Sequence, residues 1–255
     1  MSIELTRCEE FAVITINRIQ ALNALNYAMV RAISRALDEV ESSDARTLFF
    51  IGAGEKAFCA GADISELVGR TIPEEYAGTR LGQELYSRIE SFRIPSIAIV
   101  NGYALGGGCE LAMACTFRVG TASAKFGLPE IKLGLVPGYG GTQRLPRLVG
   151  MAVALEILMT GRFVPAEEAL RIGLLNRVVE GNPLQAAMQY ARAFSGHGLL
   201  ALRLVRDSAL RGRDVPLHAG LGIEADLSTV SMRSDDGKEG ARAFLEKRAA
   251  IFRDR

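Results

Sequence analysis

The sequence predicts an α/β fold with a helical C-terminal part, and three observations lead to this prediction. Short, apolar, β-branched runs alternate with helix-like stretches through the first half of the chain. After about residue 150 strand-like runs become scarce, and four or five helical patterns follow. Hydrophobic residues make up 49% of the 255 residues and charged residues 23%, which is typical of a globular protein with a core of ordinary size.

Three short runs have the composition of buried strands, namely Phe11–Ile16, Thr47–Ile51 and Ile97–Val100. Residues Asn26–Val40 carry apolar side chains at three-to-four spacing, which indicates one buried helix face. A second helical pattern runs from about Glu74 to Phe92. The repeated order of strand, helix and strand predicts parallel pairing through crossover connections.

Charge and cysteine usage disfavour several classes of function. Thirty basic and 29 acidic residues give a formal net charge of +1, so we expect neither nucleic acid nor an anionic membrane as the main partner. The four cysteines show no CxxC spacing and have no histidine nearby, which disfavours a zinc site or a redox pair. Reduced, partly buried thiols in a cytoplasmic protein are the expectation.

Other common alternatives also find little support. The two histidines lie far from any serine nucleophile signature, which argues against a Ser/His/Asp mechanism. The segment Met1–Leu5 has no basic leader and is not followed by a signal-type apolar stretch. No apolar run approaches the ~20 residues needed to cross a bilayer. We therefore expect a soluble protein.

The segment Asn101–Cys115 is the richest in chemical signals. Gly106, Gly107 and Gly108 lie between a strand and a helix-forming run, where free backbone amides at a helix start suit a phosphate or a developing oxyanion. Close packing of helix on sheet explains the glycines equally well. The spacing fits no dinucleotide motif, because Leu111 stands where the third glycine belongs, and GxxxxGK[ST] is absent.

Two carboxylates are candidates for acid/base chemistry. Glu110 falls in the first turn of the predicted helix within an apolar stretch, and Glu130 follows a short strand 20 residues later. Two carboxyl groups in one pocket can divide proton donation and acceptance between them. Their spacing alone does not show that they meet, and an isolated glutamate is usually a solvated surface residue.

Two further segments, Ala57–Ile64 and Pro137–Leu145, offer additional glycine turns; the second opens a helix. The residues alone therefore predict an α/β protein, and favour an enzyme, with glycine-lined turns and two candidate carboxylates. They name no substrate.

In these segments the chain resembles the crotonase superfamily, which comprises enoyl-CoA hydratases and isomerases. The similarity runs from Asn17-Arg18 and Ala21–Leu25 to Asp236–Gly240 and Phe244–Arg248. The resemblance implies a ββα spiral catalytic core over residues 1–195 and a helical region over residues 196–255 that drives trimerisation, commonly with two trimers stacked as a hexamer.

The resemblance also implies a site. The backbone amides of Ala62 and Gly107 would form the oxyanion hole for the thioester carbonyl. Glu130 would donate a proton to C2, and Glu110 would orient and activate the water that attacks C3. Neither a metal nor a cofactor is implied, because coenzyme A arrives as part of the substrate. The residues implied to contact the acyl-CoA are Ala60, Gly61, Ala62, Asp63, Ile64, Gly106 and Gly107.

Several positions depart from the family pattern or leave questions open. Ile19-Gln20 replaces a proline and a charged residue, and Thr116, expected on the catalytic helix, stands where an aspartate is common. The segment Val68–Gly82 shapes the acyl pocket in this family but reveals no chain length. Lys247 and Arg248 could reach coenzyme A phosphates, including those bound by a neighbouring subunit, or form a solvated basic tail.

Two alternatives to a hydratase stay open. Many isomerases of the family keep only the glutamate matched by Glu130, and other hydratases or lyases share the scaffold. The second alternative is a non-catalytic relative that binds RNA, and the near-neutral net charge disfavours it.

Overall fold

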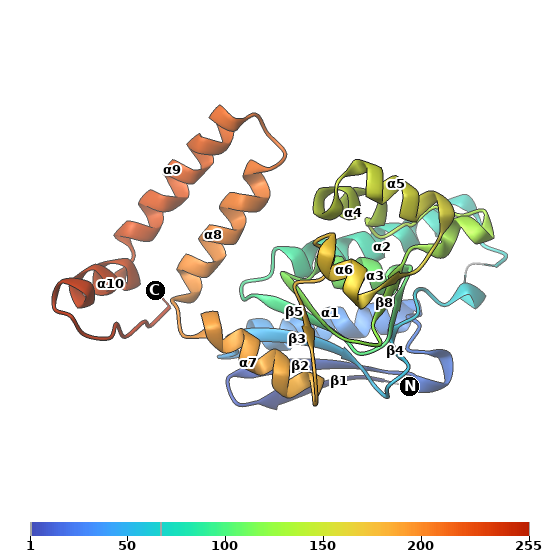
Figure 1. Cartoon of the computed structure of the whole chain (residues 1–255), viewed down its shortest axis with the longest axis horizontal. Helices are drawn as coiled ribbons and strands as arrows, with labels where there is room; N and C mark the ends of the chain where they lie inside the picture. Colours follow the sequence, from blue (N-terminus) through green and yellow to red (C-terminus); the bar gives the residue numbers. More distant parts are fainter. Residues whose placement is uncertain (1, 67, 255) are drawn as a thin grey trace. The chain divides into compact units, whose positions relative to one another are not determined.

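The computed structural model describes residues 2–66 and 68–254 and shows an α/β architecture (Figure 1). Over these residues one sheet has six strands in the order β1-β2-β3-β5-β7-β10, and a second has four in the order β4-β6-β8-β9. The strands are β1 Ser2–Cys8, β2 Phe11–Asn17, β3 Thr47–Gly52, β4 Ala57–Cys59, β5 Ser96–Val100, β6 Tyr103–Leu105, β7 Phe117–Thr121, β8 Lys125–Gly127, β9 Val164–Pro165 and β10 Arg177–Val179.

Parallel pairing dominates the six-stranded sheet, as the sequence predicts. Strands β2, β3, β5, β7 and β10 are all paired in parallel, and only β1 pairs antiparallel, with β2. The three predicted strands are confirmed as β2, β3 and β5. Strand β1 was not predicted, because as an edge strand it alternates half-buried and exposed residues and so has no continuous apolar run.

The two predicted helices of the first half are confirmed as α1 and α2. Asn26 caps α1 by accepting a hydrogen bond from the Met29 amide (2.9 Å), and Thr71 with Glu74 forms a capping box at the start of α2. The helices are α1 Tyr27–Glu41, α2 Ile72–Glu90, α3 Gly107–Ala114, α4 Gly141–Val149, α5 Met151–Thr160, α6 Ala166–Arg171, α7 Pro183–Ser195, α8 Leu199–Gly212, α9 Leu217–Arg233 and α10 Asp235–Leu245.

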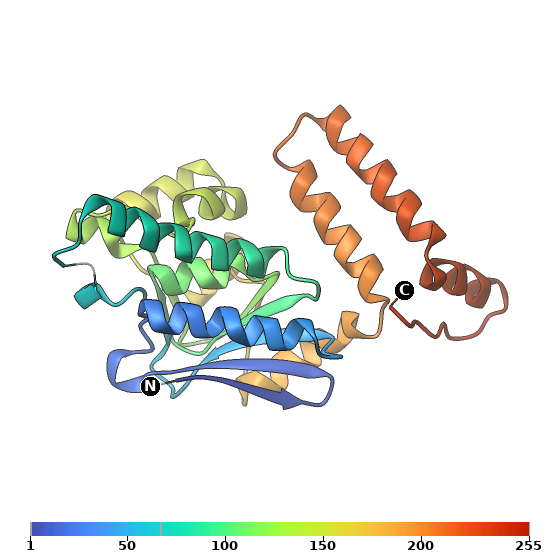
Figure 2. The ribbon, with the colours of Figure 1, turned by 180° about the vertical axis from the view of Figure 1, so that it is seen from behind.

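Helix α3 packs between the two sheets. It contacts β5 and β7 of the six-stranded sheet and β4 and β6 of the four-stranded sheet. All eight of its residues are buried, whereas α1 and α2 are amphipathic and lie side by side, and α2 packs against α3 (Figure 2). Any charged side chain on α3 is therefore held away from bulk water.

The chain divides into two compact units. One contains the residues up to Phe92 together with Ser96–Tyr190, and the other contains Arg93–Pro95 and the residues from Ala191 onward. This division falls inside α7, whose last residue, Ser195, is the end of the core predicted from the sequence. The second unit is helical: α8 and α9 lie side by side as an antiparallel hairpin, followed by α10 (Figure 1).

The sequence predicts fewer helices and strands after residue 150 than the structure contains. Six helices, α5 to α10, and two short strands, β9 and β10, are present among the described residues, where four or five helices were expected. The sequence pattern predicts a last helix from Lys238 to Phe252, whereas α10 runs from Asp235 to Leu245. Lys247 takes a left-handed conformation (φ 54°), and the described residues 246–254 carry no helix.

Thr116 does not lie on the helix that carries Glu110, which corrects the prediction. Helix α3 ends at Ala114, and Cys115 has an extended backbone. Thr116 and Ser96 then exchange two hydrogen bonds, each from a backbone amide to a side-chain hydroxyl and each 3.1 Å long. The threonine thus ties the end of the helix to the start of β5.

Among the described helices, none is both long and apolar enough to pass through a lipid bilayer.

Candidate active site

A cavity of about 530 Å³ lies in the first unit, a size that suits a small-molecule ligand. Its walls come from segments far apart in the sequence: the start of α1, the loop after β4, the first half of α2, the start of α3, and the segments before and after Gly134. Of the site residues predicted from the sequence, the cavity brings together Ala60, Gly61, Ala62, Ile64, Gly106, Gly107, Glu110 and Glu130.

Asp63 is the one predicted site residue that does not line the cavity. Its carboxylate pairs with Arg18 (2.6 Å) and accepts hydrogen bonds from the amide and the hydroxyl of Ser65. These contacts lower the pKa of Asp63. The aspartate therefore holds the shape of the loop that carries Ala62.

Two backbone amides meet at the cavity wall. Ala62 forms a parallel β-bridge with Leu25. In this bridge the Leu25 amide donates to the Gly61 carbonyl, and the Asp63 amide donates to the Leu25 carbonyl. The Ala62 N–H therefore points away from Leu25. A Cβ atom added to Gly107 would lie 3.4 Å from the Ala62 nitrogen. The amide of Gly107, the first residue of α3, has no partner within the helix.

Glycine is required where these two segments meet. Gly106 has a φ of 50°, which other residues rarely adopt, and a side chain there would approach the Glu130 carboxylate. The tight turn places the amide of Gly107 next to that of Ala62. The two amides thus lie close together at one part of the cavity wall.

Glu110 lies in the first turn of α3 and is only 1% exposed. Its Oε1 atom accepts hydrogen bonds from the amides of Tyr139 (2.8 Å) and Gly141 (2.7 Å). Its pKa is raised to about 7: burial is the largest cause and the nearby Glu130 carboxylate adds to it, while the two amides act in the opposite direction. Glu110 can therefore hold or release a proton near neutral pH.

Glu130 belongs to the 3-10 segment Pro129–Leu133, whose later residues are exposed. Burial at the cavity wall raises the pKa of Glu130. Its Oε2 atom is buried and receives no hydrogen bond from the described residues. Glu130 lines the cavity, and this oxygen keeps an unused capacity to accept a hydrogen bond.

Sequence reasoning missed the residues that support Glu110. The Tyr86 hydroxyl donates a hydrogen bond to the Gly107 carbonyl (2.7 Å) and so holds the start of α3. Arg144 donates to the Tyr139 carbonyl (3.0 Å) and pairs with Glu90 (3.0 Å). No local pattern marks them, because each acts across elements distant in the sequence.

Four charged or tyrosine side chains of the cavity wall were not among the predicted site residues. They are Tyr27, Arg70, Glu75 and Tyr139. Arg70 is the only cation among the described residues that line the cavity. Arg70 and Glu75 lie in the segment Val68–Gly82 and Tyr139 lies in Pro137–Leu145; the sequence marked both segments without singling out these side chains.

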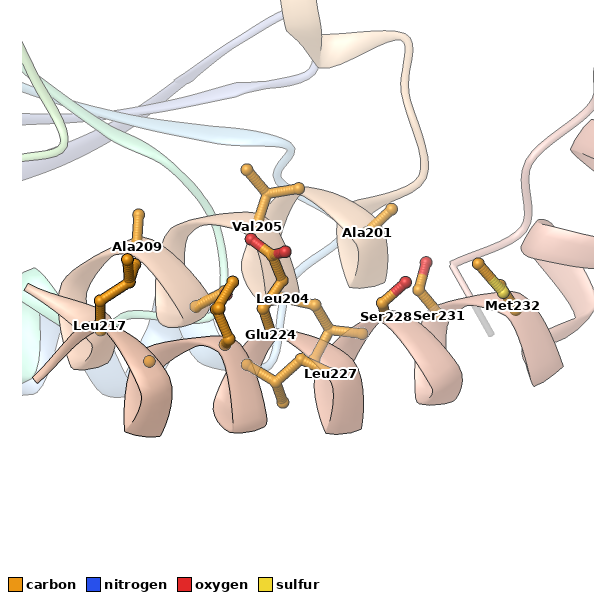
Figure 3. Close-up of a pocket in the computed structure, with 14 residues that line it drawn as sticks. Ala201, Leu204, Val205, Ala209, Leu217, Glu224, Leu227, Ser228, Ser231 and Met232 are labelled. Carbon is orange, nitrogen blue, oxygen red and sulfur yellow. The ribbon is translucent and has the colours of Figure 1, made fainter.

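A second cavity, of about 680 Å³, runs between α8 and α9 in the other unit. Apolar side chains of both helices line it, among them Leu204, Val205, Leu217 and Leu227 (Figure 3). Glu224 is its only charged lining residue among those described. One carboxylate without an acid/base partner makes this groove a poor candidate for catalysis. No group of three or more His, Cys, Asp or Glu side chains suited to a metal ion occurs among the described residues.

Known proteins similar to this chain cover nearly its whole length. The family model described as enoyl-CoA hydratase/isomerase matches residues 6–255. The crotonyl-CoA hydratase of Syntrophomonas wolfei is 44% identical over 98% of this chain and 97% of that protein. The short-chain-enoyl-CoA hydratase of Clostridium acetobutylicum is 42% identical over 93% and 92%. The crystal structure of an enoyl-CoA hydratase from Bacillus anthracis has a TM-score of 0.94 at 35% identity and covers 100% of both chains.

Proposed function

We infer the activity of this chain from the family to which it belongs, the enoyl-CoA hydratase/isomerase family. Its fold is the crotonase-like α/β fold predicted from the sequence. The chain is an enoyl-CoA hydratase: it adds water across the 2,3 double bond of an enoyl-CoA thioester to give a 3-hydroxyacyl-CoA. Two glutamates, Glu110 and Glu130, line one cavity, and this observation favours hydration over isomerisation.

We propose that one water molecule is held between Glu110 and Glu130 and attacks C3 of the bound thioester. The negative charge that develops on the thioester oxygen is met by the amides of Ala62 and Gly107, each of which stabilises the transition state by about 3 kcal/mol. Glu130 delivers a proton to C2, and addition is syn because both carboxylates serve one water. The loop Ala60–Ile64 binds the coenzyme A chain.

The electrostatics of the pair support this division of labour. Glu110, with a pKa of about 7, is substantially ionised at neutral pH and can accept a proton from water. The raised pKa of Glu130 lets it carry a proton at a higher pH than a solvated glutamate does. Because the two share protons through the water, their titration belongs to the pair. The proposal needs neither a metal nor a separate cofactor.

The test is the loss of the conjugated-thioester absorbance of crotonyl-CoA with wild type, Glu110→Gln and Glu130→Gln. We expect rapid loss with wild type and a fall in kcat of about 10²–10⁴-fold for each variant. A folded wild type that turns over neither short nor long enoyl-CoA would refute the hydratase assignment. Loss of isomerase activity in Glu130→Gln with retention in Glu110→Gln would favour the isomerase alternative.

We also propose that the chain forms a homotrimer or a homohexamer through its helical C-terminal unit. Exposed apolar side chains of α8 and α9 support this, among them Val205 (72% exposed), Leu217 (78%) and Met232 (70%), because exposed apolar patches of this kind mark interaction surfaces. Light scattering of the purified protein measures the state. The four free cysteines, three of them buried, support the cytoplasm as its location.

A further inference from the structure

The loop formed by residues 138–141, which we call the amide loop, holds the carboxylate of Glu110. Its Tyr139 and Gly141 amides both donate to Glu110 Oε1, at 2.8 and 2.7 Å. Three of its four residues are glycines, and Gly140 has a φ of 112°, so the side chains of the loop do little to fix its conformation. The position of the two amides therefore depends on the elements around the loop.

One face of helix α2 lies against the amide loop. Its members are three or four residues apart, as neighbours on one face of a helix are: Thr79, Gly82, Gln83 and Tyr86. A Cβ added to Gly138 would lie 3.5 Å from Thr79, and one added to Gly82 would collide with the Tyr139 ring. The Tyr86 ring meets the Tyr139 ring edge-on, with centroids 5.5 Å apart. Because Gly82 has no side chain, the helix approaches the loop closely at this point.

Gln83 forms a hydrogen bond from this helix face to the amide loop. Its Nε2 atom donates to the Gly138 carbonyl (2.9 Å). Its Oε1 atom accepts from Arg80 of the same helix (3.1 Å), so both ends of the side-chain amide have a partner. Gln83 is half-buried and does not line the cavity. It can therefore affect a bound ligand only through the loop.

The Gly138 carbonyl and the Tyr139 amide belong to one peptide group. Because a peptide group is planar and trans, its C=O and N–H point in opposite directions. Gln83 holds the oxygen, and the N–H donates to Glu110 Oε1. A donor at the carbonyl also polarises the peptide group and strengthens its N–H as a donor. A continuous chain of hydrogen bonds thus runs from α2 through this peptide group to the carboxylate.

Arg144 of α4 holds the next carbonyl of the loop, but it acts on Glu110 in two ways. It donates to the Tyr139 carbonyl (3.0 Å) and pairs with Glu90, the last residue of α2 (3.0 Å). Its positive charge also lowers the pKa of Glu110. A change at Arg144 would mix loss of position with loss of charge, whereas Gln83 is neutral. Positioning alone is therefore tested at Gln83.

The groups that face Glu110 leave its titration readable. Among the described residues, Glu130 raises its pKa and Arg144 lowers it. Arg118 of β7 lies at the far end of α3, where it donates to the Cys115 carbonyl (2.9 Å). The other titratable side chains around α3 are phenols and thiols with raised pKa values, which stay neutral near pH 7: Tyr86, Tyr139, Cys59, Cys109 and Cys115. Glu130 and Arg144 are unchanged in every variant compared below.

We propose that Gln83 is a positioning residue for hydration, which aims the Tyr139 amide at Glu110 and so holds the carboxylate in place. This inference rests on the hydratase function proposed above and adds to it a residue that contacts neither the substrate nor the attacking water.

The experiment measures kcat/KM for crotonyl-CoA against pH, which reports the titration of the free enzyme, in wild type, Gln83→Met and Gln83→Lys. Methionine has a similar length but cannot donate to the Gly138 carbonyl, whereas lysine restores a donor. The matched control is Glu84→Met, which changes the next residue of α2. The Glu84 side chain is 67% exposed and does not line the cavity.

The amide of Tyr139 lowers the pKa of Glu110, so a badly aimed amide should raise it. We expect the midpoint at which activity rises with pH to move upward by about one pH unit in Gln83→Met. At pH 7 kcat should fall about five- to tenfold with KM within about twofold of wild type. Neither Gln83→Lys nor Glu84→Met should move the midpoint upward. An unmoved midpoint in Gln83→Met, or an equal upward shift in Gln83→Lys, overturns the inference.

Infrared difference titration of the Glu110 carboxyl group, with the Glu110→Gln spectrum subtracted, gives a second readout that needs no turnover. The midpoint should be about 7 in wild type and about one unit higher in Gln83→Met. An unchanged midpoint contradicts the inference even if activity falls. If folded wild type does not hydrate crotonyl-CoA but the infrared shift occurs, the proposed function fails and the positioning of Glu110 by Gln83 stands.

Discussion

The two glutamates of the site lie on regions of opposite character. Glu110 belongs to α3, an eight-residue helix that is buried throughout and lies between two sheets. Glu130 belongs to Pro129–Leu133, a single 3-10 segment whose residues are half-buried or exposed. Two backbone amides hold Glu110 Oε1, whereas Glu130 Oε2 has no partner among the described residues.

This difference shows how one residue type can serve two roles. The buried helix supplies a carboxyl group in a set position with a pKa of about 7. The exposed segment supplies a carboxyl group with one oxygen that has no partner among the described residues. In the proposed mechanism the two scaffolds would divide orientation of the water from proton delivery.

The largest effect is expected when both carboxylates are neutralised. If they act as one unit through a shared water, the double variant Glu110→Gln/Glu130→Gln should lose about as much kcat as the worse single variant, within tenfold. Steady-state hydration of crotonyl-CoA by the three variants measures this. Losses that multiply would mean that the two groups act independently.

Glycine substitutions compare the two scaffolds directly. A Cβ at Gly108 on α3 would collide with the Cys59 carbonyl, a backbone atom that cannot move aside, so Gly108→Ala should lower the free energy of unfolding by about 3 kcal/mol or more. Gly134, which ends the segment of Glu130, has a φ of 71° and no atom within 4 Å of an added Cβ. Gly134→Ala should cost only about 1–2 kcal/mol, from its left-handed backbone.

Urea denaturation of both variants, with circular dichroism, provides the measurement. Equal losses would contradict the view that α3 is the constrained scaffold and the Glu130 segment the tolerant one.

The pKa of Glu110 predicts how stability depends on pH. A raised pKa means that the folded state holds the proton more tightly than the unfolded state, so its contribution is complete below the ordinary value of 4.5. That contribution is lost as the pH rises from 4.5 to about 7, by up to about 3 kcal/mol. Unfolding of wild type and Glu110→Gln from pH 4.5 to 8.5 should give curves that diverge over this window, the variant losing less stability. Parallel curves would place the pKa of Glu110 near its ordinary value.

The smallest effect is expected for the support of α3. Tyr86→Phe removes the hydrogen bond to the Gly107 carbonyl, which keeps its bond within the helix, so the loss is that of one hydrogen bond, about 0.5–1.5 kcal/mol. The matched control is Tyr76→Phe on the same helix, whose ring is 68% exposed and which should change stability by less than about 0.5 kcal/mol. A similar change in both would mean that the Tyr86 hydroxyl does not support α3.

The sequence predicts those parts of the fold and the site that depend on residues close together in the chain. The apolar run Ile97–Val100, the glycines that follow it and the helix behind them place Gly107 and Glu110 correctly, because strand, turn and helix are contiguous. The sequence identifies Glu130 as a candidate, but its spacing from Glu110 does not predict that the two carboxyl groups lie near each other. The fold brings them together from different elements.

Long-range features escape prediction for the same reason. Tyr86, Tyr139 and Arg70 enter the site through side chains that cross from other elements, and their surroundings in the sequence resemble ordinary helix and loop. Thr116 was placed on α3 because the helical pattern does not show where the helix ends; its exchange of hydrogen bonds with Ser96 exists only after β5 and β7 pair.

Burial on α3 raises the pKa of Glu110 to about 7. Burial also raises the pKa of Glu130, which lies on the more exposed segment. Infrared difference titration of protein carrying ¹³C-labelled glutamate, with Glu110→Gln subtracted to isolate one carboxyl group, tests the pKa of Glu110 directly. We expect the carboxyl band of Glu110 to titrate with a midpoint of about 7. A midpoint near 4.5 would show that α3 does not tune this residue, and the division of roles between the two glutamates would fall with it.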